Sequence, residues 1–319
     1  MHKGSYDAFV INVDSRGTFL SSILIGGTGS ESGNGIRILS DGSRILTGAF
    51  ESNDGNFEQM NQGKSDAFLM KIDDKGFVIW NKSFGGTARD GAWSVLKLAD
   101  NTCLVVGNSS SNNGFIAGKN KGESDVIAMR IDEHGDIIWM KNYGGSAQDD
   151  CYGACHLTDG GYLLVGTTES DDGDFLNEKI EAGDVFVMKI DSSGDVVWKQ
   201  IFGGKAKDHG AGVVLTNDGN ILVAGLITIQ TEGSSKEDHT DLLLAMVESS
   251  GKVLWVKSFG GSGNETHVRA AIKRNGDIVV TGATTSNDGL FKGLNHGRDD
   301  IFILTFDTKG NLKSGNIRR

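Results

Sequence analysis

Five carboxylates occupy one repeated position in this chain, five residues after the first glycine of a Gly-Gly pair. They are Glu31, Asp90, Asp149, Asp208 and Glu265. Carboxylates gathered in a ring could bind Ca²⁺ or Mg²⁺, because both cations prefer oxygen ligands. The alternative is that each acid accepts backbone N–H bonds and fixes its own turn. The structural alternative is favoured, since the acid recurs in every repeat whereas one cation needs only one site. No other cofactor is predicted.

A second position carries an aromatic residue in only two repeats. Trp93 and Tyr152 stand there, where other repeats have Asn34, Ala211 and Val268. The same alignment places four charged or titratable residues nearby: Arg89, Asp149, Asp150 and His209. Aromatic faces beside charged groups suit a sugar or another flat, polar ligand. These residues are therefore the candidate ligand site, and packing within inner strands is the alternative.

The loops between repeats carry a weaker signal. The phrase Ser-Asn-Asp-Gly followed by Phe begins at Ser52 and Ser286 and, slightly altered, at Ser111 and Ser170. It lacks the spaced acids and closing Glu of an EF-hand, so a structural turn is favoured over a calcium loop. In the fourth repeat a different loop, over residues 226–241, stands in place of this phrase. It is either an interaction loop or the result of sequence drift in a tolerant loop. No nucleophile motif, phosphate-binding loop or His-Glu-x-x-His is present, so an enzyme is the less favoured alternative.

The elements that hold these residues repeat along the chain. A phrase of Asp, a short apolar run, a second acid, Gly and usually Trp starts at Asp7, Asp66, Asp125, Asp184, Asp241 and Asp300. Successive starts are 59, 59, 59, 57 and 59 residues apart. A period of this length indicates one copied supersecondary unit, which buries its apolar faces against its neighbours.

Each unit is predicted to form four antiparallel strands. Alternating apolar residues, turns such as Asp73–Gly76, and Asp-Gly or Asn-Gly pairs mark two hairpins per unit. Four such strands repeated around a ring define a β-propeller. Six copies of the first hairpin and five of the second predict five blades plus an extra hairpin. The alternative is a six-bladed ring with one incomplete blade.

The period predicts a single domain over residues 1–319. The N-terminal hairpin covers 6–27, and the repeats cover 28–86, 87–145, 146–204, 205–261 and 262–319. A Trp stands seven residues after the second acid in the four middle copies, at Trp80, Trp139, Trp198 and Trp255. We expect each Trp to pack against an adjacent blade, as a structural residue. An aromatic ligand box is the rival interpretation.

Composition excludes several classes of partner. The chain has 319 residues, with 31 Lys plus Arg against 42 Asp plus Glu, for a net charge of −11. Such a surface repels nucleic acid, and no apolar run is long enough to insert into a membrane. Disulfides are not expected among the three cysteines. Cys151 and Cys155 lie four apart in a predicted strand, roughly 13 Å from each other, which is too far for a bond.

The repeat motifs resemble a known class of repeat. Residues 203–208 (GGKAKD), 218–225 (DGNILVAG) and 66–76 (DAFLMKIDDKG) resemble the bacterial β-propeller repeats named for seven-bladed propellers. The resemblance covers nearly the whole chain. It implies a bacterial cell-surface or secreted protein, but no reaction, ligand or functional residue. A weaker similarity links IDDKGFVIW to the tryptophan-docking repeat of quinone-dependent dehydrogenases. Lys71 and Lys75 replace that repeat's Ala and Thr, so no quinone cofactor is inferred.

These patterns lead to one expected function. We expect a non-catalytic propeller at the bacterial surface, or secreted, which binds a protein partner or a carbohydrate at the channel mouth. A polysaccharide-acting enzyme and a structural spacer without a ligand are the alternatives. The first residues, MHKGSYD, are not a secretory signal and resemble an inter-strand loop. The chain is therefore expected to be a piece of a longer protein.

Overall fold

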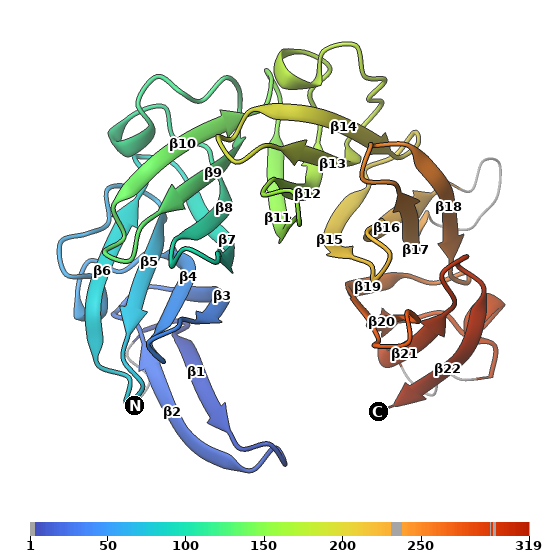
Figure 1. Ribbon diagram of the computed structural model, residues 1–319, viewed down its shortest axis with the longest axis horizontal. Helices are drawn as coiled ribbons and strands as arrows, with labels where there is room; N and C mark the ends of the chain where they lie inside the picture. The colour runs from blue at the N-terminus through green and yellow to red at the C-terminus, as the bar shows by residue number, and fades with distance from the viewer. Residues whose placement is uncertain (1–3, 231–237, 294, 296–297, 319) are drawn as a thin grey trace. The chain divides into compact units, whose positions relative to one another are not determined.

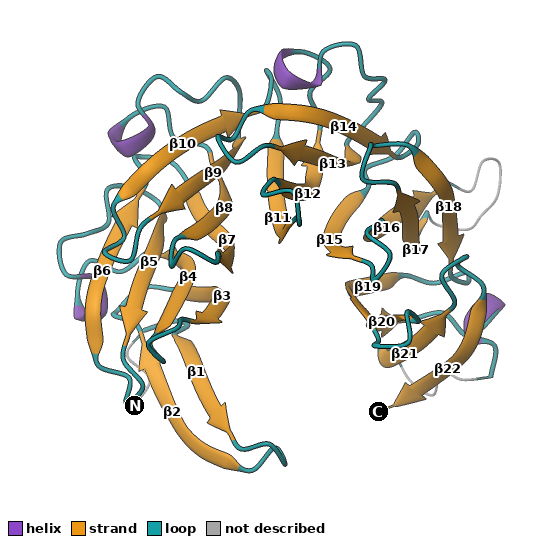
Figure 2. Cartoon of the chain, viewed as in Figure 1, coloured by secondary structure: helices purple, strands orange, loops and turns teal. Residues whose placement is uncertain are grey.

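The regular secondary structure of the described residues is almost entirely antiparallel β-strand (Figures 1 and 2). A computed structural model describes residues 4–230, 238–293, 295 and 298–318. Residues 231–237 of the fourth-repeat loop lie outside the described residues. The chain divides into two compact units, Met1–Asp150 and Cys151–Arg319.

The first unit holds three sheets. A two-stranded sheet, β1–β2, precedes two four-stranded sheets, β3–β6 and β7–β10. The strands are β1 (Ala8–Val13), β2 (Phe19–Ile25), β3 (Glu31–Ile38), β4 (Arg44–Phe50), β5 (Asp66–Ile72), β6 (Val78–Phe84), β7 (Asp90–Lys97), β8 (Cys103–Ser109), β9 (Asp125–Ile131) and β10 (Ile137–Tyr143).

The second unit holds three four-stranded sheets, β11–β14, β15–β18 and β19–β22, and β11 begins in the last two residues of the first unit. The strands are β11 (Asp149–His156), β12 (Tyr162–Thr168), β13 (Asp184–Ile190), β14 (Val196–Phe202), β15 (His209–Leu215), β16 (Ile221–Ile229), β17 (His239–Val247), β18 (Val253–Phe259), β19 (Glu265–Ile272), β20 (Ile278–Thr284), β21 (Asp300–Phe306) and β22 (Leu312–Arg318).

The hairpin turns follow from the Asp-x-x-Gly phrase. In β5–β6, Asp73 Oδ1 accepts the backbone N–H of Lys75 at 2.9 Å and that of Phe77 at 2.8 Å. Gly76 closes the turn at φ +96, a left-handed conformation that favours glycine. The acid and the glycine therefore fix the register of the two strands.

The core lies on the two middle strands of each sheet. Every residue of β5 is buried, whereas β6 is buried only at Phe84. The described helices are 3₁₀ turns in the loops after β4, β8, β12 and β20 (Figure 2), at Gly55–Phe57, Gly114–Ile116, Gly173–Phe175 and Gly289–Phe291. Each delivers one buried apolar side chain to the core. Within the described ranges, no helix is long and apolar enough to cross a membrane.

The structure confirms the predicted all-β propeller fold. The described strands form five four-stranded sheets and one two-stranded sheet. Six sheets, one of them incomplete, agree with the alternative of six blades with one incomplete. All three cysteines are free thiols, as expected. A single domain over residues 1–319 stays a prediction.

Candidate functional site

The two-stranded blade is the place where the repeat is broken. In every other sheet the strand that corresponds to β1 pairs on both sides, as β5 does with β4 and β6. Among the described strands, β1 pairs with β2 alone, through residues 8–13 and 19–25 (Figure 1). The backbone of β1 is thus left with one open edge, the edge at which two more strands pair in the complete blades.

The open edge leaves a large aromatic side chain uncovered. Asp7-Ala8-Phe9 repeats Asp66-Ala67-Phe68, so Phe9 and Phe68 occupy equivalent positions. Phe68 is 0% exposed and Phe9 is 65% exposed. The ring of Phe68 packs against Phe57 at a centroid distance of 5.2 Å and lies over Gly48 of the neighbouring strand. Among the described residues, no strand or loop supplies these two contacts to Phe9.

A cavity beside β1 marks the same gap. It has a volume of about 690 Å³ and is lined by β1 together with β3 and β4, including Ala8, Gly33 and Ala49. The corresponding pocket between β3–β6 and β7–β10, which includes Ala67 and Ala92, has about 20 Å³. The complete blade fills this space with its own inner strands.

The rim of the cavity is charged. Arg89 lies on it and is exposed, and its guanidinium group makes no hydrogen bond or ion pair with any described residue. The other charged lining residues are Asp7, Glu31 and Glu51. Of the predicted ligand residues, Arg89 is the one that lines this cavity.

Buried carboxyl pairs are the feature that the blades share. Asp66 Oδ2 accepts the backbone N–H of Gln62 at 2.8 Å, and Asp90 Oδ2 accepts that of Gly86 at 2.9 Å. A Cβ on Gly85 would lie 2.4 Å from Asp66 Oδ1 and 2.7 Å from Asp90 Oδ2, so the two carboxyls fill the space that a side chain would need. The equivalent pairs are Asp7–Glu31, Asp125–Asp149, Asp184–Asp208 and Asp241–Glu265.

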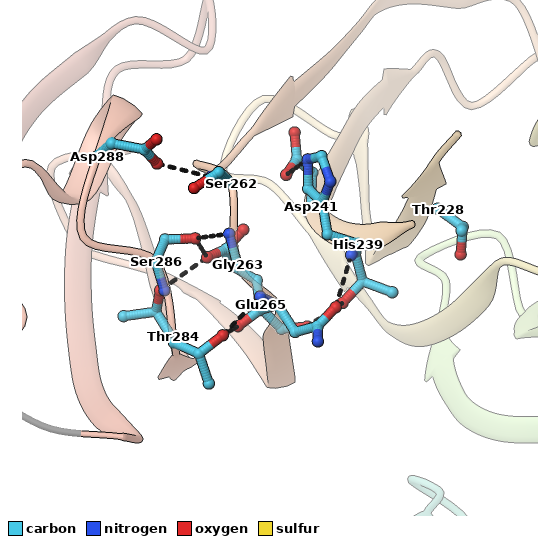
Figure 3. Close-up of polar contacts among 12 residues, drawn as sticks. Thr228, His239, Asp241, Ser262, Gly263, Glu265, Thr284, Ser286 and Asp288 are labelled. Atoms are coloured by element: carbon cyan, nitrogen blue, oxygen red, sulfur yellow. Dashed lines mark hydrogen bonds and ion pairs between the residues drawn. The ribbon is translucent and has the colours of Figure 1, made fainter. Parts of the chain in front are cut away.

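Burial shifts the titration of these pairs. It raises the pKa of Asp66, Asp125, Asp184 and Asp208 to about 6. The pKa of Glu265 rises to about 7, again mainly through burial. Figure 3 shows Glu265 accepting from Thr284 and Ser286. Both hydroxyl groups lie 2.7 Å from Oε1, and these bonds lower the pKa against the effect of burial. The four pairs that contain these acids therefore retain a proton at a higher pH than an exposed acid would.

The five predicted metal-site acids are buried members of these pairs. Glu31, Asp90, Asp149 and Asp208 each accept a backbone N–H from the Gly-Gly segment, at 2.9–3.0 Å. Among the described residues, no group of three or more His, Cys, Asp or Glu side chains is arranged to hold a metal ion. Binding of Ca²⁺ or Mg²⁺ at these acids stays a prediction.

The side-chain amide of Asn108 links Trp93 to Asp150. The indole Nε1 of Trp93 donates to Asn108 Oδ1, and Asn108 Nδ2 donates to Asp150 Oδ1 at 2.6 Å. Trp93 is 37% exposed and Asp150 is buried. The first unit thus joins an exposed aromatic ring to a buried carboxylate. Tyr152 and His209 lie in the second unit, near the starts of β11 and β15, and a site shared with Trp93 stays a prediction.

The repeated tryptophans lie against turns of the following sheet. The indole N–H groups of Trp80, Trp198 and Trp255 donate to the carbonyl oxygens of Glu133, Ser249 and Thr308, at 3.1–3.3 Å. Each ring also covers the turn glycine, as Trp80 covers Gly135. Trp139 is half-buried in β10. A structural role for all four tryptophans stays a prediction.

Residue patterns did not single out Phe9. Its phrase, Asp-Ala-Phe, is that of a complete blade, as at residues 66–68. The unequal count of hairpins pointed to the incomplete blade, but no residue pattern indicated that the ring of Phe9 would be exposed.

No protein-family profile matches the chain. The regulatory protein FlaEY of Caulobacter vibrioides is 25% identical over 221 residues. The match covers 65% of this chain and 22% of that protein, so this chain spans only a small part of its curated relative.

The solved structures share the fold at low identity. A protein of unknown function from Dyadobacter fermentans has a TM-score of 0.52 at 10% identity, over 99% of this chain and 87% of that one. Cobalt-substituted apocarotenoid oxygenase of Synechocystis has a TM-score of 0.48 at 13% identity, over 97% of this chain and 67% of that one.

The comparison corrects the expected function. We expected a non-catalytic propeller that binds a partner or carbohydrate at the channel mouth, and this expectation is wrong because the similar structures include enzymes, the apocarotenoid oxygenases. Likenesses at 13% identity or below concern the fold and assign no activity to this chain.

Proposed function

We propose that this chain is part of a regulatory protein in which the two-stranded blade β1–β2 is the regulated element. The uncovered edge of β1, in a chain whose five other sheets all have four strands, carries the proposal. The curated relative is named a regulatory protein, and 25% identity over 221 residues supports the same kind of role here.

An open blade is suited to two states. An unpaired strand edge is a template for another strand, and a two-stranded hairpin is marginally stable unless it packs on a larger structure. Here the buried Ala8 and Val10 pack the hairpin into the core of β3–β6. The hairpin therefore stays folded while its outer edge is open. Pairing at that edge converts an open state into a completed state, and a difference of a few kcal/mol between such states is enough for a switch.

The cellular setting is part of the proposal. The similarity of the repeats to bacterial surface and secreted propellers supports a bacterial protein of that location.

A complementation experiment tests the regulatory role. The gene is deleted in the source organism, and the expression profile is compared after complementation with the wild-type chain and with Phe9→Asp. We expect Phe9→Asp to reproduce the deletion profile, because a charge on β1 prevents strand pairing. The matched control is Phe19→Asp, at a residue of β2 that is 61% exposed and should complement fully.

Two results would contradict the proposal. A deletion that leaves gene expression unchanged removes the regulatory role. Full complementation by Phe9→Asp, with circular dichroism showing that both variants are folded, would show that the β1 edge takes no part in the regulatory role.

A further inference from the structure

Residues 203–207, between β14 and β15, lack a cover that their counterparts in other sheets have. We propose that this segment binds a carboxylate group of a ligand, in the place that a side chain of the sheet's own loop fills elsewhere. The inference goes beyond the proposed function and does not depend on β1, since the segment lies in the second unit.

The counterpart in the β19–β22 sheet shows what the cover is (Figure 3). Asp288 Oδ1 accepts the backbone N–H of Ser262 at 2.6 Å, and Ser286 Oγ accepts that of Gly263 at 3.0 Å. The β3–β6 and β7–β10 sheets have the same two bonds, at 2.8–2.9 Å, and their acceptors are Asp54 and Ser52 in the first and Asn113 and Ser111 in the second. An acid or amide oxygen and a serine hydroxyl therefore cover the segment in all three sheets.

The acid or amide oxygen lies over the second glycine of the Gly-Gly pair. A Cβ on Gly27, Gly86 or Gly261 would lie 2.3–2.6 Å from it. The same Cβ on Gly204 would have no described atom within 4 Å. Gly203 and Gly204 are exposed, whereas their counterparts are buried before β3, β7 and β11 and half-buried before β19. The place of the oxygen is thus open in the β15–β18 sheet.

The segment is uncovered because the middle strands of its sheet are longer. β16 and β17 have nine residues each and pair as far as Ile229, so the chain continues as a ladder where the other loops fold back. Ile229 stands four residues after Gly225, where the other complete sheets have the serine. Its apolar side chain accepts no hydrogen bond, and no described residue bonds the N–H of Ala206, the counterpart of Gly263.

The uncovered segment is still held in shape by its own sheet. The N–H of Gly204 donates to Asp208 Oδ2 at 3.0 Å, a bond that the covered segments also make. Thr228 Oγ1 donates to the carbonyl oxygen of Lys207 at 2.6 Å. A donor site of fixed geometry is therefore present before any ligand arrives, which reduces the cost of binding.

Positive charge stands where the loop's own acceptor is missing. Lys205 occupies a position that holds a hydroxyl residue in the other complete sheets, at Thr28, Thr87, Ser146 and Ser262. Lys207 is exposed, and its ammonium group pairs with Glu169 in the loop after β12, which holds it beside the segment. Backbone N–H groups and ammonium groups bind a carboxylate through charge-assisted hydrogen bonds. The lysines therefore suit a negatively charged acceptor supplied by a ligand.

The test follows the backbone amide signals of Gly204 and Ala206 by NMR at pH 7 in the full chain. The probes are sodium acetate and the peptide acetyl-Ser-Gly-Asp-Gly-Ser-amide. The controls are sodium chloride at equal ionic strength and the same peptide with Asn in place of Asp. We expect saturable shifts with both carboxylates, and a response at least about tenfold weaker to the controls. A peptide that binds at least about tenfold more tightly than acetate would identify the ligand as an acidic side chain of a protein, and equal affinities would identify it as a free carboxylate.

A glycine variant tests the place of binding without disturbing the fold. Gly204→Ala puts a methyl group where the carboxylate would lie, and it should weaken binding at least about tenfold. The unfolding midpoint should stay unchanged, because no described atom lies within 4 Å of the added Cβ. The matched control is Gly212→Ala, which also adds a Cβ in open space and should bind normally. Lys205→Thr restores the residue type of the covered segments and should weaken binding.

Three results would overturn the site. Equal shifts with sodium chloride would mean an effect of ionic strength alone. Unchanged binding by Gly204→Ala would place the carboxylate elsewhere. Binding that appears only after residues 231–237 are replaced by a Gly-Ser linker would make the chain's own loop the occupant instead of a ligand. None of these results bears on the β1 edge, so the proposed function is tested separately.

Discussion

The β1–β2 hairpin and the β3–β6 sheet begin their shared phrase with the same three residues, yet they bury them differently. Phe68 is enclosed by Gly48, Phe57 and Phe50, whereas Phe9 is 65% exposed. Both strands pair with the following strand in the same register. The difference shows that the preceding hairpin and its loop bury this position, and that the strand's own sequence does not.

The largest expected effect separates the two phenylalanines. Phe68→Ala should lower the free energy of unfolding by about 3–5 kcal/mol, the usual cost of removing a buried aromatic ring. Phe9→Ala should cost less than about 1 kcal/mol, because its ring is mostly in water already. Urea unfolding of the two variants measures both. Equal losses would mean that Phe9 is covered in solution.

The glycine opposite Phe68 gives the next effect. Gly48→Ala should destabilise by about 1–3 kcal/mol, because its Cβ would overlap Ser32 and the Phe68 ring. The control is Gly212→Ala, since nothing lies within 4 Å of the added Cβ, and we expect a change within about 0.5 kcal/mol. Similar unfolding midpoints for the two variants would refute a steric reason for this glycine.

The carboxyl pairs should make stability depend on pH. The pKa of Asp66 is about 6 in the folded protein, against 3.8 for an Asp outside the fold, so the folded state binds the proton more tightly. This group therefore stabilises the fold at low pH, and that contribution is lost as pH rises from about 4 to 6. Asp66→Asn should flatten the dependence of the unfolding midpoint on pH over that range. Asp74→Asn, at an exposed turn, should leave its slope unchanged, and a parallel profile for Asp66→Asn would count against the pairs.

The smallest expected effect concerns the polar link in β7–β10. Trp93→Phe removes the indole donor to Asn108 and should cost about 0.5–1.5 kcal/mol, the net value of one hydrogen bond. Ala49 stands in β4 where Asn108 stands in β8, so the β3–β6 sheet has no such link. The control is Phe77→Ala, at an aromatic residue that is 70% exposed, and this variant should not reproduce the loss. Tryptophan emission and unfolding midpoints are measured for both variants. A loss of more than about 3 kcal/mol in the free energy of unfolding for Trp93→Phe would show that Trp93 is a core residue.

Periodicity made much of this molecule predictable. The 59-residue repeat, the alternation within strands and the Asp-x-x-Gly turns predicted antiparallel four-stranded sheets, because each depends on local geometry or on a copied interface. The unequal count of hairpins also predicted the incomplete blade. Four of the five acids after Gly-Gly bond backbone amides, as a turn residue would, while their binding of a cation stays a prediction.

Only the tertiary structure decided which of these identical phrases are covered. Asp-Ala-Phe at residues 7–9 and at residues 66–68 has one sequence and two environments, because burial depends on strands far along the chain. The raised pKa of Asp66 is likewise a tertiary effect, since Asp66 and Asp90 come from different sheets and meet only when both turns are formed. The amino-acid sequence determines the pattern of a blade by itself, because that pattern is local. The completeness of the blade, and with it the open edge of β1, is set by which strands lie beside it.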